Sequence, residues 1–162
     1  MKALVITSRY PFTYFGGDAT RTLNLIEYLK NLNFEVDLLS FSDKKTKPIF
    51  KKNINEQHIV HNRNTISRNI YIFCSIFSKR PIQCSYFVNQ NTKQYLNKFD
   101  FDKYDIIIIF LTRLSSIIEF IKDKNKIIFD MADILTINYK NAWKAKGLAL
   151  KWKIIYTIEY FL

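Results

Sequence analysis

Apolar runs and apolar stripes alternate along this chain. The stretch Lys2–Thr7 contains the unbroken run Ala-Leu-Val-Ile, which is typical of a strand covered on both faces and therefore of a parallel sheet. From Asp18 onward, leucine and isoleucine recur at steps of three residues, the spacing of a helix with one apolar face. We therefore expect a strand, a connecting loop and a helix that ends near Phe34.

The same alternation continues through the rest of the chain. Further strands are expected at 35–41, 57–61, 104–111 and 126–130, and helices at 67–77, 83–99 and 115–122. Strands that alternate with helices predict an α/β fold, a Rossmann-like doubly wound parallel sheet in a single domain over residues 1–140. Residues 141–162 are expected to begin a basic, amphipathic helical segment that is truncated within its apolar stripe.

Polar residues follow the predicted strands, at the sheet edge where doubly wound proteins bind their ligands. They are Arg9 and Gly16-Gly17 after the first strand, Asp43 after the second, Arg113 after the fourth, and Asp130 and Asp133 after the fifth. We treat this edge as the candidate functional site.

The glycine pair Gly16-Gly17 stands where the first helix is expected to begin. Glycine tolerates positive φ and allows a ligand to approach the backbone closely, and the amides at a helix start favour negative charge. Phosphate is the obvious ligand for such a corner. The pair also fits a simple tight turn in which Asp18 is the helix N-cap.

The chain is strongly basic, with a net charge of +11 and a pI near 9.6. Lysine far outnumbers arginine, and lysine, isoleucine and asparagine are together abundant, as an AT-rich coding bias would produce. Lysine also suits bidentate reading of bases and phosphates less well than arginine. No motif typical of nucleic-acid recognition is present, so a nucleic acid is the less favoured partner.

An anionic membrane surface is a more plausible partner. Lysines alternate with tryptophan, leucine and isoleucine between Lys140 and Ile155, a mixture that suits the headgroup boundary. An amphipathic helix that packs on the core and exposes a basic face explains the same pattern. With neither a secretory signal nor an apolar run long enough to span a bilayer, we expect a cytoplasmic protein that could be peripheral at the inner face of the membrane.

Several common chemistries lack their motifs in this sequence. The glycine fingerprints of dinucleotide and nucleoside-triphosphate sites are absent, as is the nucleophile elbow of serine hydrolases. His58 and His61 have no neighbouring ligand set, so we expect surface residues and no metal site. Cys74 and Cys84 are expected to be reduced, apolar side chains.

Four segments in order resemble the N-terminal domain of GT-B glycosyltransferases of the family 4 group, in the subgroup that builds capsule and exopolysaccharide. They are Ser8-Arg9-Tyr10-Pro11-Phe12 with Gly16-Gly17-Asp18 and Phe34-Glu35-Val36-Asp37, Lys79-Arg80-Pro81 with Tyr86-Phe87, Tyr104-Asp105-Ile106-Ile107 with Thr112-Arg113, and Phe129-Asp130-Met131-Ala132-Asp133. The resemblance covers nearly the whole chain.

The resemblance implies that this domain binds a glycan or lipid-linked acceptor on one side of a cleft. A second Rossmann-like domain would hold the nucleotide-sugar donor on the other side, and Gly16 and Gly17 would approach its diphosphate. Arg21, Arg113, Asp130 and Asp133 are the implied anion- or acceptor-binding residues, although Arg21 also fits a solvated helix position and the aspartates also fit helix caps. No bound cofactor is implied.

The nucleotide loop and the paired glutamates of that family are missing from these residues. We therefore expect the N-terminal half of a two-domain enzyme, inactive alone, with catalytic residues in a separate C-terminal donor-binding domain. Two other functions stay open: a non-catalytic domain that binds a glycan or a partner, and a basic α/β domain that binds nucleic acid.

Overall fold

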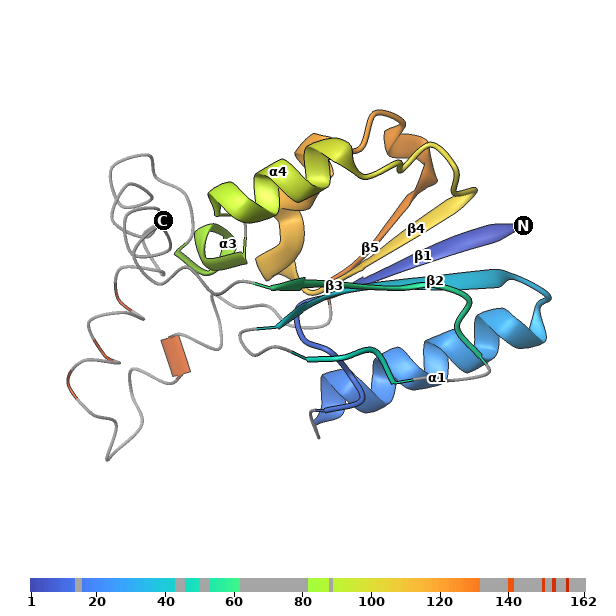
Figure 1. Ribbon diagram of the computed structural model, residues 1–162. Coiled ribbons are helices and arrows are strands. Elements are labelled where there is room, and N and C mark those ends of the chain that lie inside the picture. Colours follow the sequence, from blue (N-terminus) through green and yellow to red (C-terminus); the bar gives the residue numbers. More distant parts are fainter. Residues whose placement is uncertain are drawn as a thin grey trace.

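A computed structural model describes residues 1–13, 16–42, 46–49, 53–61, 82–87 and 89–131, and in addition residues 140, 141, 150, 153 and 157. Five parallel strands form one sheet in the order β3-β2-β1-β4-β5 (Figure 1). The strands are β1 (Lys2–Thr7), β2 (Glu35–Ser42), β3 (Gln57–His61), β4 (Ile106–Phe110) and β5 (Ile127–Asp130). The prediction of a Rossmann-like parallel α/β domain is confirmed.

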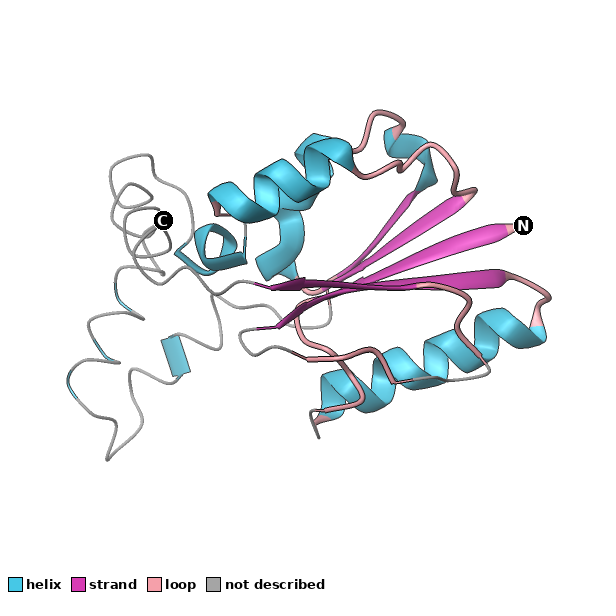
Figure 2. Cartoon of the chain, viewed as in Figure 1, coloured by secondary structure: helices cyan, strands magenta, loops and turns pink. Residues whose placement is uncertain are grey.

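Helices cover both faces of this sheet (Figures 1 and 2). On one face lies α1 (Gly17–Asn31). The other face carries α3 (Ile82–Phe87), α4 (Gln90–Lys98) and the 3-10 helix η1 (Thr112–Phe120). A short 3-10 turn, η2 (Lys124–Lys126), leads into β5.

The apolar run in β1 is explained by its central place in the sheet. It pairs with β2 on one side and β4 on the other, so that Val5 lies between Leu38 and Ile108. Ala3 and Val5 belong to the core under α1, whereas Leu4 and Ile6 belong to the core under α4 and η1. All four side chains are fully buried, and each larger one contributes roughly 1.5–3 kcal/mol through loss of contact with water.

The first helix ends earlier than expected. It stops at Asn31, with Leu32 as C-cap, because Asn33 takes the left-handed conformation at φ 62°. The amide of Phe34 then donates to the carbonyl of Leu29, which closes the helix end. Because asparagine tolerates this conformation better than most residues, Asn33 is the residue in the sequence that indicates the end of this helix.

The expected single helix over 83–99 is wrong, because the chain forms two helices there. Asn89 is extended and buried, and its side chain accepts a hydrogen bond from the amide of Thr92, which makes it the N-cap of α4. The helix expected at 115–122 is instead the 3-10 helix η1, which begins earlier and places Arg113 inside its first turn.

Some expectations fall outside the described residues. These are the helix at 67–77, Asp43, Cys74, Asp133 and most of the segment 141–162. Within the described part of the chain, no helix is long and apolar enough to cross a membrane.

Candidate functional site

The sheet changes winding direction between β1 and β4. From β1 the chain proceeds outward to β2 and β3, whereas β4 and β5 lie on the other side of β1. In open α/β sheets, ligands bind outside the carboxyl ends of the strands at such a switch point. This edge therefore defines the candidate site.

A small hollow lies at the switch point, lined by the ends of β1 and β4 and by the start of α1. Its lining includes Thr7, Ser8, Asp18 and Leu111, and its volume of about 10 Å³ accommodates roughly one water molecule. The hydroxyl of Thr7 donates to the carbonyl of Arg9 over 2.7 Å and fixes the chain as it leaves β1. The described residues enclose no larger pocket at this point.

Tyr10, just beyond this turn, has a structural role. Its ring is buried, and its hydroxyl donates to the side-chain carbonyl of Gln57 over 2.6 Å and accepts from the amide of Ile49 over 2.7 Å. The side-chain amide of Gln57 in turn donates to the carbonyl of Ile49. Tyr10 thus joins the segment before β3 to the core and directs no polar group toward the site.

The glycine pair stands at the start of α1, as expected, but without the positive φ that the sequence predicted. Gly16 is the N-cap of α1 and is fully extended, with φ 179° and ψ 168°, and Gly17 is already the first helical residue. Positive φ is therefore not required at Gly16. The alternative with Asp18 as N-cap is also wrong, because the helix begins one residue before Asp18.

The start of α1 nevertheless offers exposed backbone donors. The first intrahelical bond is from the amide of Thr20 to the carbonyl of Gly16, so the preceding amides lack helical acceptors. Asp18 accepts from the amide of Ala19 over 3.2 Å. A Cβ built on Gly17 meets no heavy atom within 4 Å among the described residues, so internal packing does not require glycine here.

Asp18 affects the charge that this corner favours. Its carboxylate lies in the first turn of α1 and lines the hollow. A carboxylate there stabilises the helix through the macrodipole but opposes a second anion in the same place. The Asp18 carboxylate therefore cancels part of the positive potential that a phosphate group would meet at the start of α1.

The backbone is strained at the residue that follows β4, which the sequence analysis did not predict. Leu111 has φ 75° and ψ 139°, a conformation that leucine rarely adopts, and its side chain is buried. Such residues cost on the order of 1–3 kcal/mol and cluster at functional sites. Leu111 lines the switch-point hollow, so the strain coincides with the candidate site.

Arg113 lies two residues farther on, in the first turn of η1. Its Nε atom is buried and has no hydrogen-bond partner among the described residues. A buried donor without a partner costs roughly 1–3 kcal/mol unless a ligand satisfies it. Arg113 is therefore the candidate side chain with a buried donor that no described residue satisfies.

Arg21 and Asp130 are brought together as a pair. The Arg21 Nη2 atom lies 3.0 Å from the Asp130 Oδ1 atom, so Arg21 is not simply solvated. Asp130 is the last residue of β5, and it caps no described helix. Its backbone carbonyl accepts from the amide of Leu111, which connects this ion pair to the strained turn.

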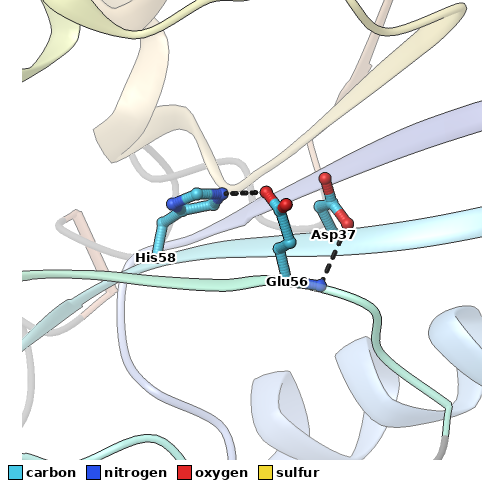
Figure 3. A group of neighbouring side chains, drawn as sticks. All are labelled: Asp37, Glu56 and His58. Carbon is cyan, nitrogen blue, oxygen red and sulfur yellow. Dashed lines mark hydrogen bonds and ion pairs between the residues drawn. The ribbon is translucent and has the colours of Figure 1, made fainter.

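A second polar cluster lies near the opposite, amino edge of the sheet (Figure 3). Asp37 in β2 is fully buried, and its carboxylate accepts from the amide of Glu56 over 3.1 Å and from the hydroxyl of Tyr104 over 2.8 Å. Lys103 places its ammonium 3.1 Å from Glu56 and 3.8 Å from Asp37. The sequence analysis did not find this cluster, because its members come from three separate segments.

Charge and burial set the protonation of this cluster. The hydrogen bond and charge of Lys103 lower the pKa of Glu56 below its usual value. Burial, and then the charge of Lys103, lower the pKa of His58. Burial and the bond to Asp37 raise the pKa of Tyr104, so its phenol stays protonated as a donor.

Asp37, Glu56 and His58 place ligand atoms within 4.8 Å of one another, a spacing that could hold a metal ion. The ammonium of Lys103 already provides the positive charge between the two carboxylates. A metal ion would have to displace Lys103 and break the bond from Tyr104, so the cluster is better explained as a structural network. The expectation that His58 is a surface residue is wrong, since its side chain is 23% exposed and its ring contacts Phe99, whereas His61 is exposed.

Cys84 is a free, buried thiol, as expected for a reduced cysteine. Its sulfur lies 3.3 Å from the hydroxyl of Ser115 and 3.6 Å from the carbonyl of Thr112, and so joins α3 to η1.

Comparisons with known proteins do not assign the chain to a family. No family model matches it, and neither the curated proteins nor the solved structures contain a match. The geometry by itself identifies a five-stranded parallel α/β domain, with strain at Leu111 and a buried Arg113 Nε atom that no described residue pairs with at the switch point.

Proposed function

We propose that this chain is the acceptor-side domain of a two-domain glycosyltransferase. In this proposal the switch point faces the diphosphate of a nucleotide sugar that a second domain holds. The acceptor, a glycan or a lipid-linked glycan, lies on the same edge of the sheet. The reaction is transfer of the sugar to an acceptor hydroxyl, with a nucleoside diphosphate as the leaving group.

The observation that carries the proposal is the start of α1. The amides that precede its first intrahelical bond lack helical acceptors, and the space where a Cβ of Gly17 would lie is empty of described atoms. Amides at a helix start hold phosphate oxygens well, and a missing side chain allows close approach. As the sugar leaves, negative charge grows on the diphosphate, and donors fixed in advance stabilise that charge.

Arg113 has a complementary role in the proposal. Its guanidinium keeps its charge at every physiological pH, so it suits binding of an anionic group and not proton transfer. Its buried Nε atom has no partner among the described residues, which supports a role in binding such a group on the acceptor. Arg21 and Asp130 form the flank of the site, and Asp133 stays a prediction.

The size of the hollow supports a shared site. A volume of about 10 Å³ holds far less than a nucleotide sugar, so the donor requires a second wall. The glycine loop and paired glutamates that bind the donor in this family are absent from these residues, and the catalytic groups are assigned to that second domain.

The proposal is tested with inorganic pyrophosphate as the probe, titrated calorimetrically at low ionic strength. We expect weak binding that Gly17→Val reduces at least about tenfold, because a branched side chain blocks access to the amides. The matched control is Asn24→Val, which adds the same side chain at an exposed position farther along α1.

Two results would contradict the phosphate site. One is equal binding by wild type and Gly17→Val, which would indicate non-specific attraction to a chain of charge +11. The other is no binding by wild type at all. Binding of a glycan acceptor without pyrophosphate binding would favour the alternative of a non-catalytic glycan-binding domain.

A further inference from the structure

The sheet ends at β5, whose outer edge pairs with no strand in the described part of the chain. Edge strands carry unpaired N–H and C=O groups, which proteins usually protect with charged side chains or proline. Residues 127–129 of β5 include neither. Ile128, within the strand, is 50% exposed, and Met131, just beyond it, is 65% exposed. This edge therefore presents an apolar template for another strand.

The backbone groups of β5 point alternately toward β4 and away from it. The carbonyl of Asp130 accepts from the amide of Leu111, so the backbone groups of Asp130 face β4, as do those of Ile128 two residues earlier. The N–H and C=O groups of Ile127 and Phe129 therefore point outward. Their separation of two residues is the spacing at which an antiparallel partner strand forms paired hydrogen bonds.

The side chains of β5 alternate between the two faces of the sheet. Ile127 and Phe129 pack on the core under α4 and η1. Ile128 lies beside Ile108 on the face that carries α1. Since α1 packs on β1 and β2, Ile128 stays half-exposed on that face.

We propose that β5 pairs with β5 of a second copy of this chain, antiparallel and about a two-fold axis at Ile128. In this register Ile127 of each copy exchanges two hydrogen bonds with Phe129 of the other, which joins the two sheets into one. The two Ile128 residues lie directly opposite each other, with their Cα atoms about 4.5 Å apart. The interface is isologous, as in most dimers of identical chains.

Charge complementarity selects a second copy as the partner. Lys126 and Asp130 stand two residues before and after Ile128, so each Lys126 comes opposite Asp130 of the second copy. Arg21 contacts the Oδ1 atom of Asp130, and the other carboxylate oxygen can accept from the lysine. In the single chain the Lys126 ammonium lies 3.4 Å from the carbonyl oxygen of Asp102, a long hydrogen bond that the new pair can replace.

The other edge strand, β3, shows the contrast. A two-fold axis through its central residue, Ile59, would set Gln57 opposite His61, which is not a pair of opposite charges. The Gln57 side chain is also already bonded to Tyr10 and to the carbonyl of Ile49. Self-pairing is therefore favoured at β5 and not at β3.

Ile128→Cys tests the register by disulfide formation under mild oxidation. Two cysteines with Cα atoms about 4.5 Å apart are within disulfide range, so we expect a covalent dimer on a non-reducing gel. Met131→Cys is the matched control on the same edge, because its two copies would be about 20 Å apart, six residues at about 3.4 Å each. Wild type, with its native Cys74 and Cys84, gives the background.

Sedimentation velocity over a range of concentrations tests the pairing without a covalent bond. It is done at physiological salt, where screening limits the repulsion between two chains of charge +11. We expect a reversible dimer that Lys126→Glu weakens about tenfold, because it sets like charges opposite each other in both pairs. Lys98→Glu makes the same charge change at an exposed position on α4 and should dimerise at least as well as wild type.

A chain that stays monomeric at every concentration would overturn the proposal. Efficient cross-linking of Met131→Cys, or equal weakening by Lys98→Glu and Lys126→Glu, would overturn it as well, because each would indicate non-specific association. The cysteine substitutions are at exposed positions, and thermal unfolding of every variant verifies the fold. Pyrophosphate binding at Gly17 is measured separately, so failure of the dimer does not bear on the proposed function.

Discussion

The two edges of the sheet treat polar groups in opposite ways. At the amino edge, the buried carboxylate of Asp37 is satisfied by Tyr104, Lys103 and the amide of Glu56. At the carboxyl edge, Leu111 is strained and the Nε atom of Arg113 has no partner in the described part of the chain. Stability alone explains the first edge and leaves the second unexplained. Unsatisfied, strained positions are expected where a protein binds its ligand.

The largest effect is expected at the amino edge. Asp37→Ala leaves the hydroxyl of Tyr104 and the amide of Glu56 without an acceptor, and the free energy of unfolding should fall by about 3 kcal/mol. Urea denaturation measures it. Asp37→Asn, which retains an oxygen acceptor, is the matched control and should lose clearly less. If both variants lower the free energy of unfolding equally and by less than about 1 kcal/mol, the network does not stabilise this edge.

A smaller effect is expected at Leu111, where glycine should be less destabilising than alanine, the reverse of the usual order. Glycine in place of alanine normally destabilises by roughly 0.5–1 kcal/mol, but glycine accepts the positive φ found here. We therefore expect Leu111→Gly to be about 1 kcal/mol more stable than Leu111→Ala, with the loss of the leucine side chain common to both. The control pair at Leu114, buried in η1, should show the ordinary order. The ordinary order at both sites would argue against strain at the switch point.

At Gly17, stability and binding should move in opposite directions. Gly17→Ala adds a helix-favouring residue into empty space and should raise the free energy of unfolding by at most about 1 kcal/mol. The same methyl group crowds the exposed amides and should weaken pyrophosphate binding. Denaturation and calorimetry on one preparation measure both. A variant that is more stable and binds equally well would indicate that glycine has no role in ligand approach.

The smallest effect is the response of the amino edge to pH. The pKa of His58 is lower in the folded protein than its ordinary value of 6.5. As the pH falls through 6.5, the unfolded chain therefore takes up a proton on His58 before the folded chain does. The free energy of unfolding should therefore decrease as the pH falls through that range, and His58→Gln should flatten the decrease. The lowered pKa of Glu56 adds a further loss below about 4.5. His61→Gln retains His58 and should keep the decrease; if it is the variant that flattens the curve, the assignment to His58 is wrong.

The sheet could be predicted because its signals are local. The apolar run of β1 and the isoleucine run of β4 specify buried parallel strands without reference to distant residues. Helix ends were predicted less well. Asn33 and Asn89 set two of them through backbone conformation and capping, which apolar periodicity does not register.

The places of the candidate residues in the fold could be predicted in part, but their contacts could not. Asp130 lies at the carboxyl end of β5, as the topology predicts, and it is paired with Arg21 of α1. The strain at Leu111 arises at the connection between β4 and η1, so no residue type in the sequence predicts it. The network around Asp37 depends on partners 19 and 67 residues away in the sequence, which only the folded chain brings together.

The glycosyltransferase proposal requires that diphosphate bind at the carboxyl edge, at the start of α1. Amide-resolved NMR during a titration with uridine diphosphate measures this, because each backbone amide reports separately. We expect the largest shifts at Gly17, Asp18 and Ala19, with further changes at Leu111 and Arg113 and none at Asp37 or Tyr104. Shifts centred on the amino edge, or spread evenly over surface lysines, would contradict it.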